Sequence, residues 1–379
     1  MILDYETLQL VWWLLIGVLL IGFSATSGMD MGVAMLMNFI GKHEDERRVI
    51  VNTVAPHWDG NQVWLITAGG AIFAAWPDVY AAAFSGFYLA MLLVLFALIL
   101  RPLAFDYRAK IDNPGWRAKW DWALFVGSFV PALIFGVAFG NLLQGVPFHF
   151  DEMLRIHYEG SLLTALLPLL NPFAILAGVI SVAMLTMHGG VWLELRAENI
   201  IAERARKAVI GAGIVTTVLF VLGGIWVASG IDGYRLVESG SSILGKTVVS
   251  EPGAWMAIFS AMPITILAPA LGIGGPLLTA FLSCKRRPAL AFVTSILGLA
   301  GIIVTAGVSM FPFIMPSSTD PKSSLMVWDA TSSPLTLTVM FWAAAIFVPI
   351  VLAYTFWCYW RMWGQVTVAD IRERSHSVY

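Results

Sequence analysis

Two short segments place polar side chains inside otherwise apolar stretches of the chain. The first is SGMDMG at 27–32, which contains Asp30, and the second is APHWDGNQVW at 55–64, which contains His57 and Asp59. Carboxylates and imidazole take up and release protons near neutral pH. Such side chains are costly at bilayer depth and usually have a function there. If these stretches cross a membrane, the three residues are candidates for moving protons within it.

The two carboxylates are equally distant from the middle of the chain that joins them. Residues 44–45 lie midway between Asp30 and Asp59. In an antiparallel helical hairpin, with a rise of about 1.5 Å per residue, both acids reach the same depth. Two carboxylates in a low dielectric are hard to ionise together, which suits proton exchange. The structural alternative is that each caps a helix or pairs with a polar neighbour: His57, Asn61 or Gln62.

Histidine was considered separately, because haem is a common intramembrane cofactor. Of six histidines, His57 and His188 alone fall within or at the end of an apolar stretch. Nothing in their spacing requires that they converge on one iron. We expect His57 to be a hydrogen-bonded neighbour of Asp59, and His188 to be an interfacial side chain. The sequence has no Cys/His spacing typical of zinc and no phosphate-binding loop, so no metal site is predicted.

The composition is that of a membrane protein. Of 379 residues, 59% are hydrophobic and 12% are charged, whereas a soluble domain carries about 25% charged residues. A net charge of −2 gives no reason to expect nucleic acid as a partner. Crossing the hydrocarbon takes about 20 apolar residues. The sequence predicts nine spans, at roughly 8–40, 49–75, 79–100, 120–144, 162–188, 208–229, 255–282, 289–312 and 335–360.

Basic residues set the expected orientation. If the N-terminus is outside, the inner segments hold 18 of the 22 Lys and Arg residues, and the outer segments hold Arg155, Arg235, Lys246 and Lys322. Cytoplasmic loops carry such an excess. We therefore expect an all-α polytopic membrane protein with an outer N-terminus and a cytoplasmic C-terminus. The longest connections, near 145–161, 230–254 and 313–334, fall outside.

A third polar cluster follows the third span, in RPLAFDYRAK at 101–110. The orientation places it at the cytoplasmic face. An ordinary positive-inside loop explains Arg108 and Lys110. Asp106, lying among basic residues, is a better candidate for a group that collects protons at the surface.

Taken together, these motifs resemble subunit II of the cytochrome bd-type quinol oxidases. The segments that carry the resemblance include GMDMGVAML, PHWDGNQVWLITAGGAIFAAWP, RPLAFDYRAK, FPFIMPSS and WDATSS. The likeness extends from the first span to the last residue. It is specific, because PHWDGNQVW is a run of mixed chemistry rather than an apolar match.

The resemblance implies a fold of two four-helix bundles plus one peripheral helix, divided here as 1–150, 151–312 and 313–379. It implies a complex in the bacterial inner membrane that oxidises quinol and reduces O2. Two haems b and a haem d would be held by a partner subunit I. A small single-span subunit is expected, and some members hold a structural quinone, here ubiquinone.

The resemblance also implies roles for single residues. Asp59 matches the family's intramembrane proton-path carboxylate, Asp106 and Lys110 match its cytoplasmic entrance, and Tyr379 matches a tyrosine near that entrance. We place Asp30 and His57 on the same path. In one departure, Ser27 stands where many members have Asp. Two rival functions remain open: a proton-coupled secondary transporter with its substrate site at the helix break of 56–60, and a purely structural membrane scaffold.

Overall fold

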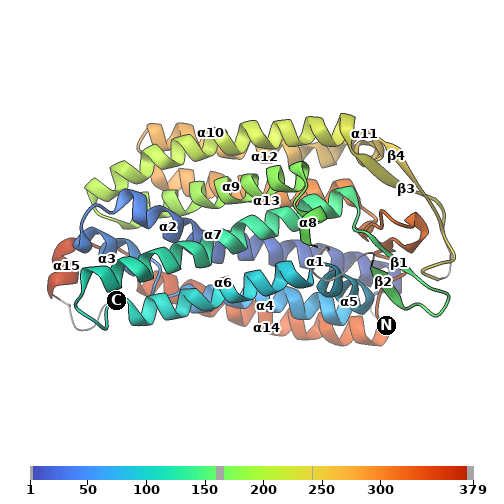
Figure 1. The fold of residues 1–379 in the computed structure, drawn as a ribbon, viewed down its shortest axis with the longest axis horizontal. Helices are drawn as coiled ribbons and strands as arrows, with labels where there is room; N and C mark the ends of the chain where they lie inside the picture. Colours follow the sequence, from blue (N-terminus) through green and yellow to red (C-terminus); the bar gives the residue numbers. More distant parts are fainter. Residues whose placement is uncertain (1–2, 159–165, 241, 374–379) are drawn as a thin grey trace.

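The computed structural model describes residues 3–158, 166–240 and 242–373, and its long helices run along the molecule (Figure 1). In these residues, eight helical segments are long and apolar enough to cross a membrane. They are Tyr5–Ile40, Tyr88–Tyr107, Pro114–Gln144, Pro172–Arg196, Ile200–Gly230, Pro263–Cys284, Pro288–Met310 and Pro334–Arg361. The chain therefore has the all-α polytopic character that its composition predicts.

The predicted span at 49–75 is not among those eight. It is divided into α3 (Glu44–Asn52), a turn, and α4 (Trp58–Ala75). Pro56 lies in the turn, where its missing N–H removes no helical hydrogen bond. The first turns of α4 carry Asp59, Asn61 and Gln62, which lower its apolar character. That α4 is a ninth span stays a prediction.

The first predicted span is also broken. It consists of α1 (Tyr5–Ala25) and α2 (Ser27–Ile40), which meet at Thr26. The Thr26 hydroxyl donates to the Gly22 carbonyl at 2.8 Å, and His188 Nε2 hydrogen-bonds to the Ala25 carbonyl at 2.9 Å. The backbone group freed by the break thus finds a partner from a distant helix, as a membrane interior requires.

The remaining elements follow the predicted order. They are α5 (Pro77–Gly86), α6 (Tyr88–Tyr107), α7 (Pro114–Gln144), α8 (Leu166–Leu169), α9 (Pro172–Arg196), α10 (Asn199–Gly230), η1 (Ala254–Met256), α11 (Ala257–Ala261), η2 (Pro263–Ile266), α12 (Leu267–Cys284), α13 (Pro288–Met310), η3 (Pro321–Ser323), α14 (Pro334–Arg361) and α15 (Val368–Glu373). Five of the long helices open on proline, which suits a first turn whose N–H groups need no helical partner.

Three antiparallel hairpins gather at one end of the molecule (Figure 1). They pair β1 (Phe148–Phe150) with β2 (Ile156–Tyr158), β3 (Asp232–Glu238) with β4 (Thr247–Pro252), and β5 (Phe313–Met315) with β6 (Leu325–Met326). These are the connections that the charge pattern places outside. Helices α3 and α15 lie at the opposite end.

Helix α9 is the centre of the packing, since it contacts α2, α7, α10 and α13. Small residues allow the closest approach: a Cβ added at Gly32 on α2 would lie 2.0 Å from the Leu185 carbonyl oxygen and 2.9 Å from the Gly189 Cα. Because α9 contacts helices of both proposed bundles, the division near residue 151 stays a prediction.

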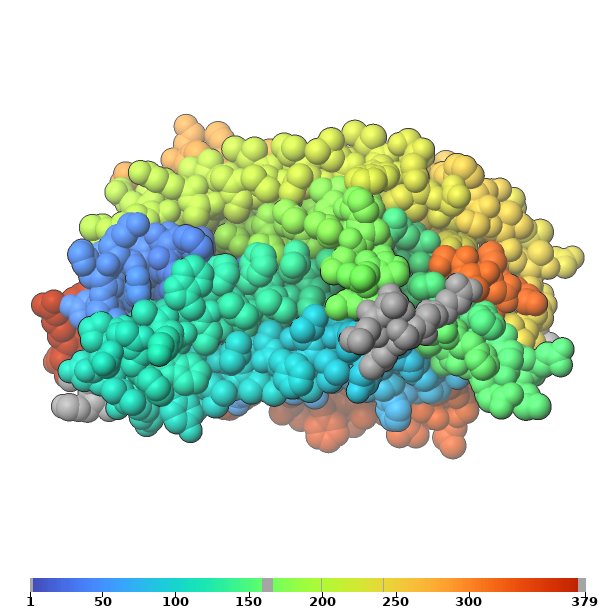
Figure 2. Space-filling view, in the orientation of Figure 1, coloured from blue at the N-terminus to red at the C-terminus, as the bar shows by residue number. Residues whose placement is uncertain are grey.

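Large apolar side chains remain exposed along the outer helices, as expected of a surface in lipid. Figure 2 shows parts of α6, α7 and α10 on one face of the molecule, with the region of α8 and α9 between α7 and α10. Phe96 on α6 is 61% exposed and Val218 on α10 is 50% exposed. Helix α14 is the most peripheral span, because only 6% of its apolar window is buried.

Candidate functional site

A buried carboxylate lies at the centre of the polar residues. Asp30, on α2, has no exposed surface. Its Oδ2 accepts a hydrogen bond from Asn61 Nδ2 at 2.8 Å, and His57 Nδ1 lies 3.8 Å from its Oδ1. The turn before α4 and the first turn of α4 supply both partners, so the first hairpin closes around Asp30.

A fourth side chain comes from the far end of the sequence. The Tyr359 hydroxyl, on α14, donates to Asn61 Oδ1 at 2.9 Å, and its ring centroid lies 4.6 Å from that of His57. His57 Nε2 hydrogen-bonds to the Thr53 carbonyl at 3.1 Å, which leaves Nδ1 to accept from the Asn61 amide at 3.2 Å. We call Asp30, His57, Asn61 and Tyr359 the Asp30 cluster.

The Asp30 cluster corrects the predicted partner of His57 and adds Tyr359, which the sequence did not predict. The expected partner of His57 was Asp59, but the structure places His57 beside Asp30 instead. Asp30 does pair with a polar neighbour, Asn61, and the places of Asp30 and His57 on a proton path stay predictions. Tyr359 escaped the sequence argument because it is separated from Asn61 by 298 residues, and no local pattern signals such a contact.

Asp59 points away from the Asp30 cluster. It is exposed in the isolated chain, whereas Asn61, two residues later, is buried. Two residues on a helix are separated by about 200°, so they face opposite sides of α4. Gln62, which is partly buried, donates its Nε2 to Ser27 Oγ at 2.5 Å. The two acids predicted at one depth therefore have different surroundings.

An aromatic stack joins the start of α4, beside Asp59, to the C-terminal end of α6. The rings of Trp58 and Phe105 are stacked, with centroids 5.2 Å apart. Each ring directly precedes an exposed acid, Asp59 in one case and Asp106 in the other. Lys110 is also exposed, one turn beyond Asp106. The proposed entrance and the proposed relay thus lie at the same end of the molecule. Tyr379 falls outside the described residues.

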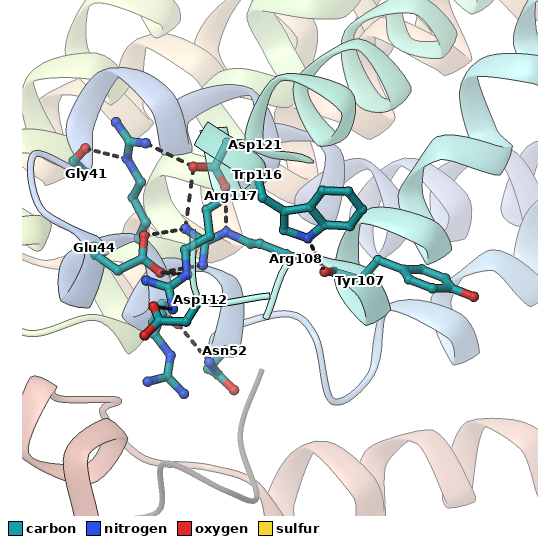
Figure 3. Close-up of polar contacts among 11 residues, drawn as sticks. Gly41, Glu44, Asn52, Tyr107, Arg108, Asp112, Trp116, Arg117 and Asp121 are labelled. Atoms are coloured by element: carbon teal, nitrogen blue, oxygen red, sulfur yellow. Dashed lines mark hydrogen bonds and ion pairs between the residues drawn. The ribbon is translucent and has the colours of Figure 1, made fainter. Parts of the chain in front are cut away.

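Buried ion pairs hold the segment after α6 in place (Figure 3). Arg108, which was expected to be an ordinary loop cation, is 3% exposed. Its Nε donates to Asp121 Oδ1 at 2.5 Å, and its two Nη atoms donate to Glu44 at 2.8 and 3.0 Å. Arg47 Nη1 reaches the second Asp121 oxygen at 2.9 Å. The cluster therefore ties α3, α6 and α7 together beside Asp106 and Lys110.

A second buried pair anchors two of the connections at the hairpin end of the molecule. Lys246 donates to Asp329, and both side chains are almost completely buried. Burial lowers the pKa of Lys246, and the attraction of Asp329 opposes that change. Nearby, Gln9 Nε2 donates to Thr331 Oγ1 at 2.8 Å. The segment WDATSS is thus a structural anchor between the β3–β4 connection and α1.

His57 and His188, the two histidines predicted within or at the end of a span, are both hydrogen-bonded within the protein. His188 was expected at the interface, yet it is fully buried. Its Nδ1 lies 2.7 Å from Ser295 Oγ, and its Nε2 hydrogen-bonds to the Ala25 carbonyl. Both nitrogens of His57 are engaged as well. Among the described residues, no group of three or more His, Cys, Asp or Glu is placed to hold a metal ion.

Comparisons with known proteins agree with one another. Residues 8–362 match the family model described as cytochrome bd terminal oxidase subunit II. The chain is 56% identical to "Cytochrome bd-I ubiquinol oxidase subunit 2" of Escherichia coli, with both chains covered completely. It is 32% identical to "Cytochrome bd ubiquinol oxidase subunit 2" of Bacillus subtilis, over 92% of this chain and 94% of the relative.

The fold is also similar to a solved structure. A chain in "The structure of bd oxidase from Geobacillus thermodenitrificans" superposes with a TM-score of 0.70 at 13% identity, covering 94% of this chain and 99% of that one. At this level of identity the likeness concerns the fold alone.

Proposed function

This chain belongs to the family of cytochrome bd terminal oxidase subunit II, and we propose that it carries protons from the cytoplasm towards the site of O2 reduction. It is a multi-pass subunit of an oxygen-reducing quinol oxidase in the bacterial inner membrane. The proposed route starts at Asp106 and Lys110 and continues through water to Asp59. In this proposal nine helices cross the membrane, with the N-terminus in the periplasm.

The observation that carries the proposal is the position of the three polar residues. Asp59, Asp106 and Lys110 are all exposed in the isolated chain, and the Trp58–Phe105 stack brings their two helices together. A carboxylate at membrane depth is costly against lipid. An exposed carboxylate on the side of α4 is therefore best explained by a polar path that a second subunit covers in the complex.

The cofactors fit a division of labour between subunits. The imidazoles of His57 and His188 are occupied by protein partners. We therefore assign the two haems b and the haem d to the partner subunit I, where they supply the redox chemistry of quinol oxidation and O2 reduction. The residues of this chain hold and move protons beside them. A small single-span subunit completes the proposed complex.

A structural ubiquinone has one candidate location. An apolar hollow lies between α6, α7 and α8, and its lining includes Phe87, Met91, Ile134, Val137 and Leu169. An isoprenoid tail is apolar and flexible, so it suits such a lining. We propose this hollow as the site for the tail if the complex holds a structural quinone.

The test is Asp59→Asn in the purified complex. The substitution keeps the size of the side chain and removes its capacity to exchange protons. We expect O2 reduction and proton uptake to slow by at least about tenfold, because positioned proton-transfer groups contribute roughly 10² to 10⁴ in rate. The haem content should be unchanged, since Asp59 is exposed and makes no hydrogen bond or ion pair with the described residues of this chain.

The matched control is Asp45→Asn. Asp45 lies at the same end of the molecule, on α3, and pairs with the exposed Arg372 at 2.6 Å. Exposed ion pairs contribute little, so this variant should turn over like the parent. If Asp59→Asn also turns over and takes up protons like the parent, the chain acts as a structural scaffold and the proposed path is wrong.

A further inference from the structure

Arg101 is a buried cation that the proposed path does not use. It lies on α6 and is 1% exposed, which places it among the largest fully buried side chains. Its Nε, Nη1 and Nη2 atoms have no hydrogen-bond partner among the described residues. A guanidinium presents five N–H donors, and lipid offers no acceptor for them. Arg101 therefore needs acceptors inside the helical bundle.

Two other unpartnered polar groups accompany Arg101. The stem of Arg101 lies against α7, because a Cβ added at Gly127 would be 3.1 Å from the Arg101 Cγ. The next residue of α7, Ser128, is fully buried and its hydroxyl also lacks a partner among the described residues. Asp30 Oδ1 also lacks a hydrogen-bond partner among the described residues. Helix α7 packs against both α2, which carries Asp30, and α6, which carries Arg101, and the opposite charges of Asp30 and Arg101 attract one another.

The two charges attract one another without meeting directly. In the described part of the chain, the basic side chain within 4.0 Å of Asp30 is His57 alone, and its Nδ1, which accepts from Asn61, has no proton to share with Asp30. An unpaired buried charge is strongly unfavourable, and nearly all buried polar groups in proteins have partners. A buried water molecule typically makes about three hydrogen bonds to such groups. Water is therefore the ligand that the chemistry of this site demands.

We propose that ordered water binds between α2, α6 and α7 and joins Arg101, Asp30 and Ser128 into a buried, water-linked ion pair. Arg101 supplies the donors, the free Asp30 oxygen accepts, and the Ser128 hydroxyl does either. The pair balances the charge of the Asp30 cluster. Because Asp30 also binds Asn61, it holds the start of α4 in place. Arg101 and Asp30 are then positioning residues for Asp59, a role that rests on the proposed function, whereas the ion pair itself does not.

A double-mutant cycle on the purified complex tests the ion pair. The variants are Asp30→Asn, Arg101→Gln and the double variant, with the melting temperature as the measurement. Each single change leaves one buried charge without its partner, so each should lower the melting temperature by several degrees. The double variant removes both charges and should recover at least half of the larger loss. Arg235→Gln is the control, because the Arg235–Glu251 pair is exposed and should shift the temperature by less than either.

Additive losses in the double variant would show that the two charges are not coupled and would overturn the proposal. A cryo-electron microscopy map of the parent complex provides a second, independent test of the water between Arg101 and Asp30. Density for at least one water molecule between the Arg101 guanidinium and Asp30 supports the proposal. A direct Arg101–Asp30 contact in the map, or a dry gap between them, contradicts it.

The positioning role has its own measurement. If Arg101 and Asp30 act by placing Asp59, the recovered double variant should regain O2 reduction and the parent's pH profile along with its stability. A stable double variant with an altered pH profile would instead mean that Asp30 itself exchanges protons. If the cycle shows coupling while Asp59→Asn keeps full turnover, the ion pair stands and the proposed proton path fails.

Discussion

The contact between α2 and α9 allows a sharp test of the packing. Gly32→Ala adds one methyl group where an ideal Cβ would lie 2.0 Å from the Leu185 carbonyl oxygen and 2.9 Å from the Gly189 Cα. Both are backbone atoms and cannot rotate away. Relief to an ordinary contact distance of about 3.4 Å requires the helices to separate by more than about 1 Å, and a gap of that size forfeits a quarter to a half of each dispersion contact along the seam.

The expected cost is about 3 kcal/mol, at the upper end of the range for overpacked cores. Two other glycines provide a graded series. A Cβ at Gly28 would meet only the flexible Leu185 side chain, with its Cδ2 at 2.6 Å, and a Cβ at Gly224 on α10 would meet nothing within 4 Å. The free energy of unfolding should therefore fall least for Gly224→Ala, more for Gly28→Ala, and most for Gly32→Ala.

The assay is the thermal melting of the purified complex together with its haem content per protein. Gly224→Ala should be neutral or slightly stabilising, because glycine loses more conformational entropy than alanine when it folds into a helix. If Gly32→Ala melts within error of Gly224→Ala, the close approach of α2 and α9 is wrong, and with it the explanation for glycine at 32 and 189.

Two further predictions concern charged groups at the end of the molecule opposite the hairpins. Burial alone would raise the pKa of Glu46, but hydrogen bonds from Arg204 and backbone N–H groups outweigh it and hold that pKa below the ordinary value of 4.5. A lowered pKa contributes stability that is present above pH 4.5 and lost as the pH falls through the folded value, so the difference in melting temperature between the parent and Glu46→Gln should shrink on acidification below pH 4.5. Asp121→Asn removes the carboxylate that Arg108 contacts at 2.5 Å, and it should lower the free energy of unfolding by roughly 3–5 kcal/mol. Asp112→Asn changes a pair whose Asp112 side chain is 93% exposed, and it should cost less than about 1 kcal/mol. Equal losses in the two variants would refute the difference in burial.

The sequence by itself determined the class of the fold. Long apolar runs must be helical in lipid because every backbone group has to be satisfied within its own segment. This rule is local, so the positions of most spans and of the three longest connections along the chain could be predicted. The candidate acids were also visible, because a charge is conspicuous in an apolar helix.

Breaks within the helices were harder to predict from the sequence. The predicted span 8–40 divides at Thr26, a residue that occurs in unbroken helices as well. The division is stable because His188, on another helix, satisfies the Ala25 carbonyl. The compensating partner decides such a break, and the local residues alone do not identify it.

The tertiary structure decided which polar groups meet. Their equal distances from residues 44–45 predict that Asp30 and Asp59 lie at the same depth in the bilayer. Those distances say nothing about the direction in which each side chain points. The rotation of α4 brings Asn61 against Asp30 and leaves Asp59 on the open face. Tyr359 reaches the same cluster across 298 residues. Local periodicity determines where a residue lies along its helix. Which other helix its side chain contacts depends on how all the spans pack together, and that is a property of the whole folded chain.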